Sequence, residues 1–304
     1  MTHPHWLAAV LVAGGVAQGG CGRLGFDASG RDGSVDDGRS NDAVPDAPFG
    51  NVRVIAELDN LSSQDDPTLT SDELELMFTS FRPGGLGDCD LWSTTRAAIT
   101  DPWRPPVNLG PTLNTAGCDS SPELAGDGLT LWFASTQTGD TALYEAHRSA
   151  RDSAWQAPAK LAALDSTTFD LGPTVTGDQR TLMFYSSRTG NFDLYVSTRA
   201  LVTDPWPAPT PVSELNTPSF EERSPFLSAD AATLWYVSSA RGNQDIYISR
   251  RQPNGRFGAP SLVSELSSAT KDDDPWVSPD QRRIYFARDV VGQPNTSELM
   301  IADR

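Results

Sequence analysis

Basic residues, histidine and cysteine are scarce in this chain of 304 residues. Lys and Arg number 23 against 40 Asp and Glu, which gives a formal net charge of −17. A nucleic-acid-binding surface needs a basic stripe that replaces phosphate counterions, so the charge excludes that class of partner. The three His and three Cys form neither the Cys/His spacing of a metal site nor a catalytic triad, and no phosphate-binding loop is present.

Long apolar runs are lacking too, and the run near the amino terminus, Leu7–Ala17, has only eleven residues. It is too short to span a bilayer but is typical of the core of a signal peptide. The Gly-Gly-Cys sequence ending at Cys21 resembles the lipobox of bacterial lipoproteins, in which the Cys thiol is acylated. Gln18, where the lipobox has an aliphatic residue, and the absence of Lys and Arg before the run depart from that pattern.

We therefore expect residues 1–21 to be a lipoprotein signal peptide with an acylated Cys21, or else an ordinary secretory signal. By the same resemblance, Gly22 in place of Asp favours an outer-membrane anchor, with the protein facing the periplasm or the outside. Residues 22–47 are rich in Asp, Gly and Ser and nearly free of large apolar residues, which predicts a disordered acidic linker.

Residues 48–304 contain five copies of one unit. Each copy has a proline, followed five residues later by Asp, nine residues later by an aliphatic residue and eleven residues later by an aromatic residue. The prolines recur at intervals of roughly 50 residues, which is the signature of a repeat architecture. They are Pro67, Pro122, Pro173, Pro225 and Pro275.

Each unit has the pattern of four short strands. In the third copy, Pro173–Thr176 is the first strand, a turn carries Asp178, and the apolar run Thr181–Tyr185 is a second strand buried on both faces. Asp193–Val196 is the third strand. The fourth begins near an aromatic residue that has a proline three residues later, which suits the outer edge of a sheet.

The fifth copy has no fourth strand after its third. FGNVRVIAEL at residues 49–58 matches FGAPSLVSEL at residues 257–266 in its Phe, Gly, Glu and Leu positions. Phe49 and Phe257 also precede the next repeat proline by the same number of residues. We therefore expect the amino-terminal strand to complete the last sheet and close a ring.

These repeats resemble the WD40-like propeller repeats of TolB-type bacterial envelope proteins. The segments that carry the resemblance are DLGPTVTGDQRTLMFYSSRTGNFDLYVSTR and EERSPFLSADAATLWYVSSARGNQDIYISR. It covers about residues 48–304 and implies an all-β fold, a five-bladed β-propeller of four-stranded antiparallel blades. By analogy it also implies a role in protein interaction at the cell envelope.

Acidic residues precede each first strand, where propeller loops gather at one mouth of the central channel. We expect a ring of carboxylates there, with the binding candidates Asp65, Asp66, Asp119, Asp170, Glu221, Glu222, Asp272 and Asp273. The ring could begin the strands only, or bind a cation such as Ca²⁺, a basic partner or a sugar. If the protein is a glycoside hydrolase, which needs two carboxylates, the catalytic candidates are Asp66, Asp170 and Glu222.

Other side chains allow narrower predictions. Arginines in the loop after the second strand are paired with acids of the third strand: Arg82 with Asp90, Arg188 with Asp193, Arg241 with Asp245 and Arg288 with Glu298. Glu123 departs from its equivalents, which are Thr68, Thr174, Phe226 and Trp276. Phe226 and Trp276 fit packing between blades, with a sugar-stacking platform as the alternative.

Cys89 and Cys118 lie in loops at the same mouth and are expected to form a disulfide in an exported protein. The function that these features favour is a monomeric, lipid-anchored, non-enzymatic scaffold that binds an envelope protein or polysaccharide without a cofactor. The alternative is a carbohydrate-active enzyme or a lectin built on the same five blades.

Overall fold

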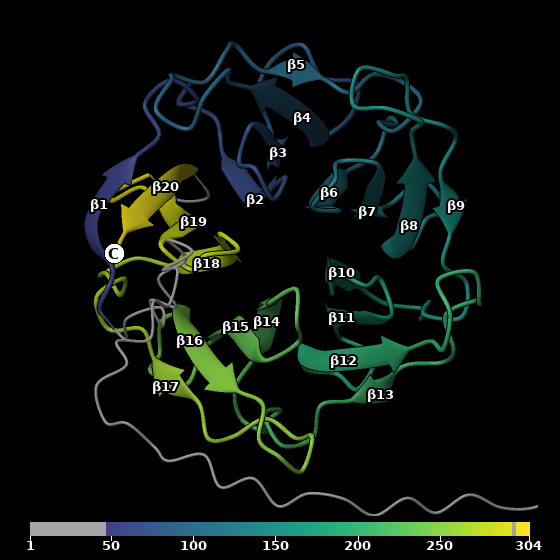
Figure 1. The fold of residues 1–304 in the computed structure, drawn as a ribbon, viewed down its shortest axis with the longest axis vertical. Helices are drawn as coiled ribbons and strands as arrows, with labels where there is room; N and C mark the ends of the chain where they lie inside the picture. The colour runs from purple at the N-terminus through teal and green to yellow at the C-terminus, as the bar shows by residue number, and fades with distance from the viewer. Residues whose placement is uncertain (1–46, 294–295) are drawn as a thin grey trace, which may run out of the picture. The chain divides into compact units, whose positions relative to one another are not determined.

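The computed structural model describes residues 47–293 and 296–304 of the protein. They form five four-stranded antiparallel sheets, which stand as blades around a common centre (Figure 1). No helix occurs in this part of the chain. The predicted five-bladed β-propeller is confirmed, whereas the predicted signal peptide, Cys21 and the linker up to residue 46 lie outside the described residues.

Each blade runs from an inner strand near the centre to an outer strand at the edge (Figure 1). Blade 1 consists of β2 (Gln64–Leu69), β3 (Glu75–Ser80), β4 (Asp90–Thr95) and β5 (Val107–Asn108). Blade 2 consists of β6 (Asp119–Leu124), β7 (Thr130–Ser135), β8 (Ala142–His147) and β9 (Ala159–Lys160). Blade 3 consists of β10 (Asp170–Val175), β11 (Thr181–Ser186), β12 (Asp193–Thr198) and β13 (Thr210–Pro211). Blade 4 consists of β14 (Glu222–Leu227), β15 (Thr233–Ser238), β16 (Asp245–Arg250) and β17 (Ser261–Leu262). Blade 5 consists of β18 (Asp272–Val277), β19 (Arg283–Asp289), β20 (Ser297–Asp303) and β1 (Gly50–Val54).

The repeated Asp builds the turn between the inner strand and the second strand. In blade 1, Asp72 Oδ1 accepts hydrogen bonds from the Leu74 N–H at 3.1 Å and from the Thr70 hydroxyl at 2.6 Å. The other blades repeat the bond to the N–H two residues on, at Asp127, Asp178, Asp230 and Asp280. The Asp is therefore a turn-forming residue in every repeat.

Hydrophobic packing lies between the blades. Every residue of β3, β7 and β15 is buried, as the continuous apolar runs predict. Five apolar clusters result, and each joins two neighbouring blades. The ring is thus held by five similar interfaces, because each sheet buries both faces against its neighbours.

An Arg after each third strand stacks on the aromatic residue that precedes the outer strand. In blade 1, Arg96 Cζ lies 4.2 Å from the ring centroid of Trp103. The equivalent pairs are Arg148–Trp155, Arg199–Trp206, Arg251–Phe257 and Arg304–Phe49. Each guanidinium covers an aromatic face and ties two consecutive strands together.

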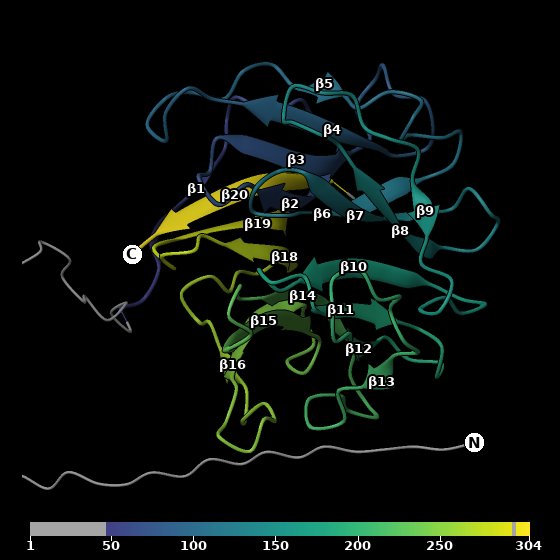
Figure 2. The same cartoon turned by 45° about the vertical axis from the view of Figure 1, so that its right-hand side comes forward.

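The amino-terminal strand completes the last blade, as predicted. Strand β1 pairs antiparallel with β20, so that Gly50 lies opposite Asp303 and Val54 opposite Met300. Figures 1 and 2 both show β1 along the outer side of β20. The Arg304–Phe49 stack belongs to the same closure, which leaves no blade without its outer strand.

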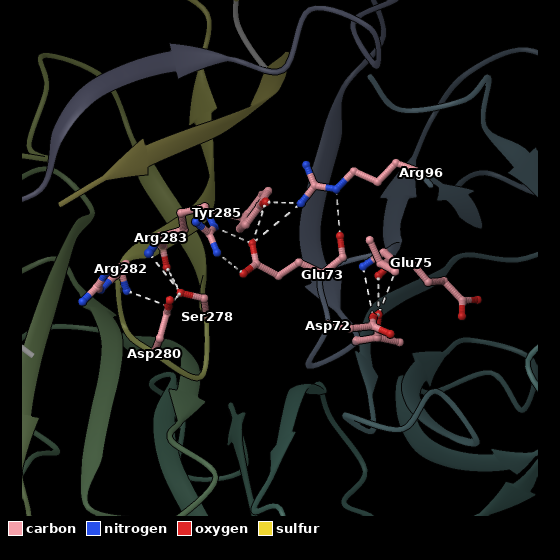
Figure 3. A network of polar contacts seen from close by, with 11 residues as sticks. Asp72, Glu73, Glu75, Arg96, Ser278, Asp280, Arg282, Arg283 and Tyr285 are labelled. Carbon is pink, nitrogen blue, oxygen red and sulfur yellow. Dashed lines mark hydrogen bonds and ion pairs between the residues drawn. The ribbon is translucent and has the colours of Figure 1, made fainter. Parts of the chain in front are cut away.

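A buried ionic network reinforces the junction between blades 5 and 1 (Figure 3). Glu73 accepts hydrogen bonds from Arg283 Nε and Nη2 at 2.7 and 2.6 Å, and from the Tyr285 hydroxyl at 3.0 Å. Arg96 donates to the Tyr285 hydroxyl at 3.1 Å. The Glu73 side chain is only 3% exposed, so these partners compensate the burial of its charge.

The loop arginines do not pair with the third-strand acids, which corrects the sequence prediction. Arg188 Nη2 lies 2.7 Å from Asp170 Oδ1, at the start of the inner strand. The predicted partner, Asp193, instead accepts a hydrogen bond from the Thr189 hydroxyl. The physical reason is burial, because Asp170 is fully buried and needs a counter-charge, whereas Asp193 is part-exposed.

Blades 1 and 5 place a guanidinium at the same position. Arg288 Nε lies 2.6 Å from Asp272 Oδ1, and Arg82 Nη2 donates to Gln64 Oε1 at 2.7 Å. Among the described residues, no ion pair joins the other predicted partners, Arg82 to Asp90, Arg241 to Asp245 or Arg288 to Glu298.

Candidate functional site

The five repeat prolines line a narrow waist at the centre of the propeller, where a space of about 30 Å³ remains. The residue before each proline lines the same space and has a left-handed backbone, with φ between 44° and 57°. Strand pairing shifts register at this point in every blade, which identifies a β-bulge. The five residues are Asp66, Ser121, Gly172, Ser224 and Asp274.

The waist separates two wider mouths. The acidic mouth lies where the inner strands begin and holds a cavity of about 390 Å³. The hairpin mouth lies where the inner strands run into their turns and holds a cavity of about 460 Å³. Both volumes fall in the range of roughly 300–1,000 Å³ that is typical of ligand pockets.

Carboxylates outnumber cations in the acidic mouth. Its lining includes five carboxylates, Asp65, Asp66, Asp273, Asp274 and Asp289, and two cations, Arg223 and Lys271. All five carboxylates belong to blades 5 and 1. The charge is therefore gathered on one side of the mouth and does not form the ring that the sequence predicts.

Asp66 and Asp274 are joined across the boundary between blades 1 and 5. The Asp66 N–H donates to Asp274 Oδ2 at 3.3 Å. Asp66 also accepts from the Thr79 hydroxyl at 2.8 Å and the Ser121 hydroxyl at 3.2 Å, and Asp274 accepts from the Ser224 hydroxyl at 2.7 Å. Burial raises the pKa of Asp66, and burial together with the Asp273 and Asp66 charges raises the pKa of Asp274 well above its usual value.

Lys271 is the main counter-charge in this cluster. Its Nζ lies 2.6 Å from Asp273 Oδ2, and the Asp273 charge raises the pKa of Lys271. Burial opposes ionisation of Asp273, but the Lys271 charge and the hydrogen bonds to the Asp273 carboxylate together outweigh it and lower the pKa of Asp273. Among the described residues, the hydrogen-bond donors to the Asp65 carboxylate are the hydroxyls of Ser63 and Ser297. Burial and the Asp66 charge raise the pKa of Asp65 to about 6.

The other predicted acids anchor loops instead of lining the channel. Four of them accept the backbone N–H of a residue in the preceding loop: Asp119 from Thr115 at 2.5 Å, Asp170 from Ser166 at 2.7 Å, Glu222 from Thr217 at 2.8 Å and Asp272 from Ser268 at 2.8 Å. Asp119 accepts from the Thr115 hydroxyl at 2.9 Å. All four are buried, so of the three catalytic candidates only Asp66 faces the channel.

The rim of the acidic mouth carries a disulfide and exposed apolar side chains. Cys89 and Cys118, the pair expected from the sequence, are joined by a disulfide between blades 1 and 2. Glu221 lies at the start of blade 4 and pairs with Arg223 at 2.7 Å. The loops on this face expose the large apolar residues Leu61, Phe81, Leu86, Phe169, Phe220 and Val291.

Sequence reasoning overlooked the special position of Asp274 and the part played by Lys271. The signal that could have identified Asp274 is its place directly before a repeat proline, which it shares with Asp66. Gly172 occupies that place in blade 3, where an added Cβ would lie 2.6 Å from the Tyr185 ring. The bulge is thus common to all blades, while its side chain is acidic in two of them.

Aliphatic and aromatic side chains dominate the hairpin mouth. The second residue after each proline forms an apolar ring: Leu69, Leu124, Val175, Leu227 and Val277. Phe226 and Trp276, which pack together with ring centroids 5.9 Å apart, lie beneath it on one side. Glu123 lies on the other side and accepts hydrogen bonds from the hydroxyls of Thr68 and Thr174 and from the Val175 N–H.

In the described part of the chain, no group of three or more His, Cys, Asp or Glu side chains is arranged to hold a metal ion. The same residues contain no helix long and apolar enough to cross a membrane.

No protein family and no curated protein matches this chain in sequence. Among solved structures, a TolB-type protein from Agrobacterium tumefaciens superposes with a TM-score of 0.55 at 17% identity, over 83% of each chain. TolB from Acinetobacter baumannii gives a TM-score of 0.54 at 16% identity. The fold is a propeller similar to those of TolB. The match covers 82% of this chain but 56% of the Acinetobacter chain.

Glycoside hydrolases have equally similar folds. A family 117 glycoside hydrolase from Zobellia galactanivorans superposes with a TM-score of 0.56 at 12% identity, over 84% of this chain and 90% of that one. An α-L-arabinofuranosidase from Podospora anserina, solved in complex with cellotriose, gives a TM-score of 0.52 at 13% identity, over 80% and 91%. At these identities the similarity establishes the propeller fold, and activity has to be argued from the site.

Proposed function

We propose that the protein is a non-enzymatic binding scaffold of the cell envelope, anchored through an acylated Cys21, whose acidic mouth binds a basic segment of a partner protein. The observation that carries the proposal is the excess of carboxylates over cations in the acidic-mouth cavity. A cationic side chain of a partner would supply the missing counter-charge and relieve the repulsion among Asp65, Asp66 and Asp274.

The exposed apolar residues on the same face support a protein partner. Large apolar side chains that are exposed together on one face mark an interaction surface, and the Leu, Phe and Val side chains of the loops on this face are exposed in this way. The partner segment would therefore combine Lys or Arg with flanking apolar residues. A nucleic acid is disfavoured by the net charge of −17.

Selection of displayed random peptides on the purified protein tests this proposal. We expect enrichment of peptides with Lys or Arg beside apolar residues, and a loss of their binding of about tenfold or more in Asp65→Asn/Asp66→Asn. Asp152→Asn, an exposed acid in the loop between β8 and β9, is the matched control. Enrichment of acidic peptides, or equal binding by both variants, would contradict the proposal.

A glycoside hydrolase is the second candidate, because Asp66 and Asp274 are neighbouring channel carboxylates with raised pKa values. Hydrolysis requires one protonated and one ionised carboxyl group. Reducing-end release from a polysaccharide panel separates the two functions. Release that persists in Asp170→Asn but disappears in Asp66→Asn and Asp274→Asn would establish the hydrolase, and we expect no release.

A further inference from the structure

The hairpin mouth differs from the acidic mouth in having almost no charge at its base. Among its described lining residues there is no Lys, Arg or His, and the acids other than Glu123 are Asp127 and Asp230, which lie exposed in the turns. Glu123 is 8% exposed and faces both this cavity and the waist. The cavity therefore has apolar walls, an exposed acidic rim and one buried carboxyl group.

No cation compensates Glu123 within the described residues. Its hydrogen-bond donors are two hydroxyls and one N–H, at 3.2 to 3.3 Å. Oε1 accepts two of these bonds and Oε2 accepts one, so Oε2 keeps a lone pair. Burial raises the pKa of Glu123 to about 7, against the lowering effect of those bonds. Buried acids such as Glu73 and Asp170, by contrast, each have an Arg partner.

Phe226 in blade 4 and Trp276 in blade 5 occupy the position equivalent to that of Glu123 in blade 2, and they line the same cavity on the side opposite the carboxyl group. Aromatic faces attract cations electrostatically, and the attraction is strongest where water is excluded. A metal ion would need several oxygen ligands, which one carboxyl group among aliphatic side chains does not provide. An organic cation, by contrast, is weakly hydrated and is suited to apolar walls.

We propose that the hairpin mouth is a binding site for a small organic cation, a quaternary ammonium group or a similarly apolar amine, held by Glu123, Phe226 and Trp276. All the charged groups that an anionic ligand would meet among the described lining residues are carboxylates. A neutral ligand would leave Glu123 without a counter-charge. The inference goes beyond the proposed function, because it concerns the opposite mouth and a different class of ligand.

Choline and its neutral isostere 3,3-dimethylbutan-1-ol provide the direct test, by calorimetric titration of the protein. The two molecules have the same shape, so a difference in affinity measures the charge alone. We expect choline to bind about tenfold or more tightly than the alcohol. Equal binding of the two molecules, or no choline binding at millimolar concentration, would overturn the proposal.

Glu123→Gln removes the charge while keeping the size of the side chain, and should abolish the preference for choline. Phe226→Leu removes an aromatic face and should weaken choline binding several-fold. Asp88→Asn, at an exposed acid in the loop between β3 and β4, is the control and should leave choline affinity unchanged. A folded Glu123→Gln protein that still prefers choline would contradict the assignment.

A pH series on the unaltered protein covers the case in which Glu123→Gln fails to fold. Choline affinity should rise by up to about tenfold between pH 6 and pH 8, because the carboxyl group ionises in that range. Thr68, Thr174, Val175, Phe226 and Trp276, which face Glu123, do not titrate. Asp66 and Asp274 at the waist also have raised pKa values, so the series is repeated in Asp66→Asn/Asp274→Asn, where the rise should persist. A flat profile would overturn the proposal.

Phosphatidylcholine carries the same cation as free choline. We therefore compare cosedimentation of the protein with phosphatidylcholine vesicles and with phosphatidylglycerol vesicles. Stronger cosedimentation with phosphatidylcholine that free choline competes away would assign the natural ligand to a lipid headgroup. Choline binding in solution without such cosedimentation would assign it to a free cation.

Discussion

The two mouths of the channel are built from the same inner strands but have opposite chemistry. On one side of the repeat prolines, Asp66 and Asp274 stand at positions where the other blades have Ser or Gly. On the other side, Phe226 and Trp276 stand where blades 1 and 3 have Thr. The backbone is the same in all five blades, with its bulge, proline and turn, so the comparison shows that function should be sought where the side chains diverge.

Asp170 at the acidic end is fully buried in its ion pair with Arg188, whereas Asp72 at the hairpin end forms a half-exposed pair with Arg151. This contrast predicts the largest effect on stability. Arg188→Met leaves Asp170 buried without its counter-charge and should lower the free energy of unfolding by about 3–5 kcal/mol. Arg151→Met breaks the half-exposed pair with Asp72 at the hairpin end and should lower it by less than about 1 kcal/mol. Urea denaturation measures both.

A double-mutant cycle isolates the pair from the packing of Arg188. Arg188→Met/Asp170→Asn should recover part of the loss, because the unpaired charge is removed. Arg188→Met/Asp193→Asn should not recover it, since Asp193 makes no ion pair with Arg188 in the described structure. Recovery with Asp193→Asn and none with Asp170→Asn would reverse the assignment.

The disulfide lies at the acidic mouth and should contribute the next largest effect. Cys89 and Cys118 are 29 residues apart, and cross-linking a loop of that length stabilises the fold by about 3–4 kcal/mol. Cys89→Ser/Cys118→Ser should lose about this amount under oxidising conditions. Under reducing conditions the variant and the unaltered protein should have nearly equal stability, and a large remaining difference would show that packing, not the bond, is responsible.

Fixed spacing made the fold predictable from the sequence. Counting the repeat prolines predicted five blades, and the Asp at a fixed distance after each proline predicted the turns. The match between residues 49–58 and 257–266 predicted the closing strand. The Arg–aromatic stacks were overlooked, although both members recur in every blade. In blades 1 to 4 each stack joins an Arg to an aromatic residue several positions later, and in blade 5 it joins Arg304 to Phe49 at the start of the propeller.

The candidate site was harder to predict because it depends on which partner each side chain contacts in the folded protein. Neighbouring acids in one strand behave differently: Asp272 anchors a loop, Asp273 pairs with Lys271 and Asp274 lines the waist. The bulge before the proline turns consecutive side chains in new directions, and strand alternation alone does not reveal it. The loop arginines were assigned to the wrong acids for a similar reason, since burial, not sequence distance, selects their partners.

The waist between the mouths should not tolerate a larger side chain at Gly172. Gly172→Ala places a Cβ 2.6 Å from Tyr185 at a left-handed position and should lower the free energy of unfolding by about 2–3 kcal/mol. Gly190→Ala is the matched control, because Gly190 is also left-handed but has no atom within 4 Å of the added Cβ. It should lose about 1 kcal/mol, from backbone strain alone. Equal losses in urea denaturation would show that Tyr185 moves aside freely.

Titration of the acidic mouth gives the smallest expected effect. The pKa of Asp65 is about 6 in the fold against a usual value of 3.8, so protonation stabilises the folded state. Its stabilising contribution is complete below pH 4 and is lost as the pH rises through 6. Relative to Asp65→Asn, the unaltered protein should therefore lose about 2 kcal/mol of unfolding free energy between pH 4 and pH 7.5. Glu123→Gln, at the hairpin mouth, should show its own change centred near pH 7, and a common midpoint for both variants would indicate that the two mouths titrate as one site.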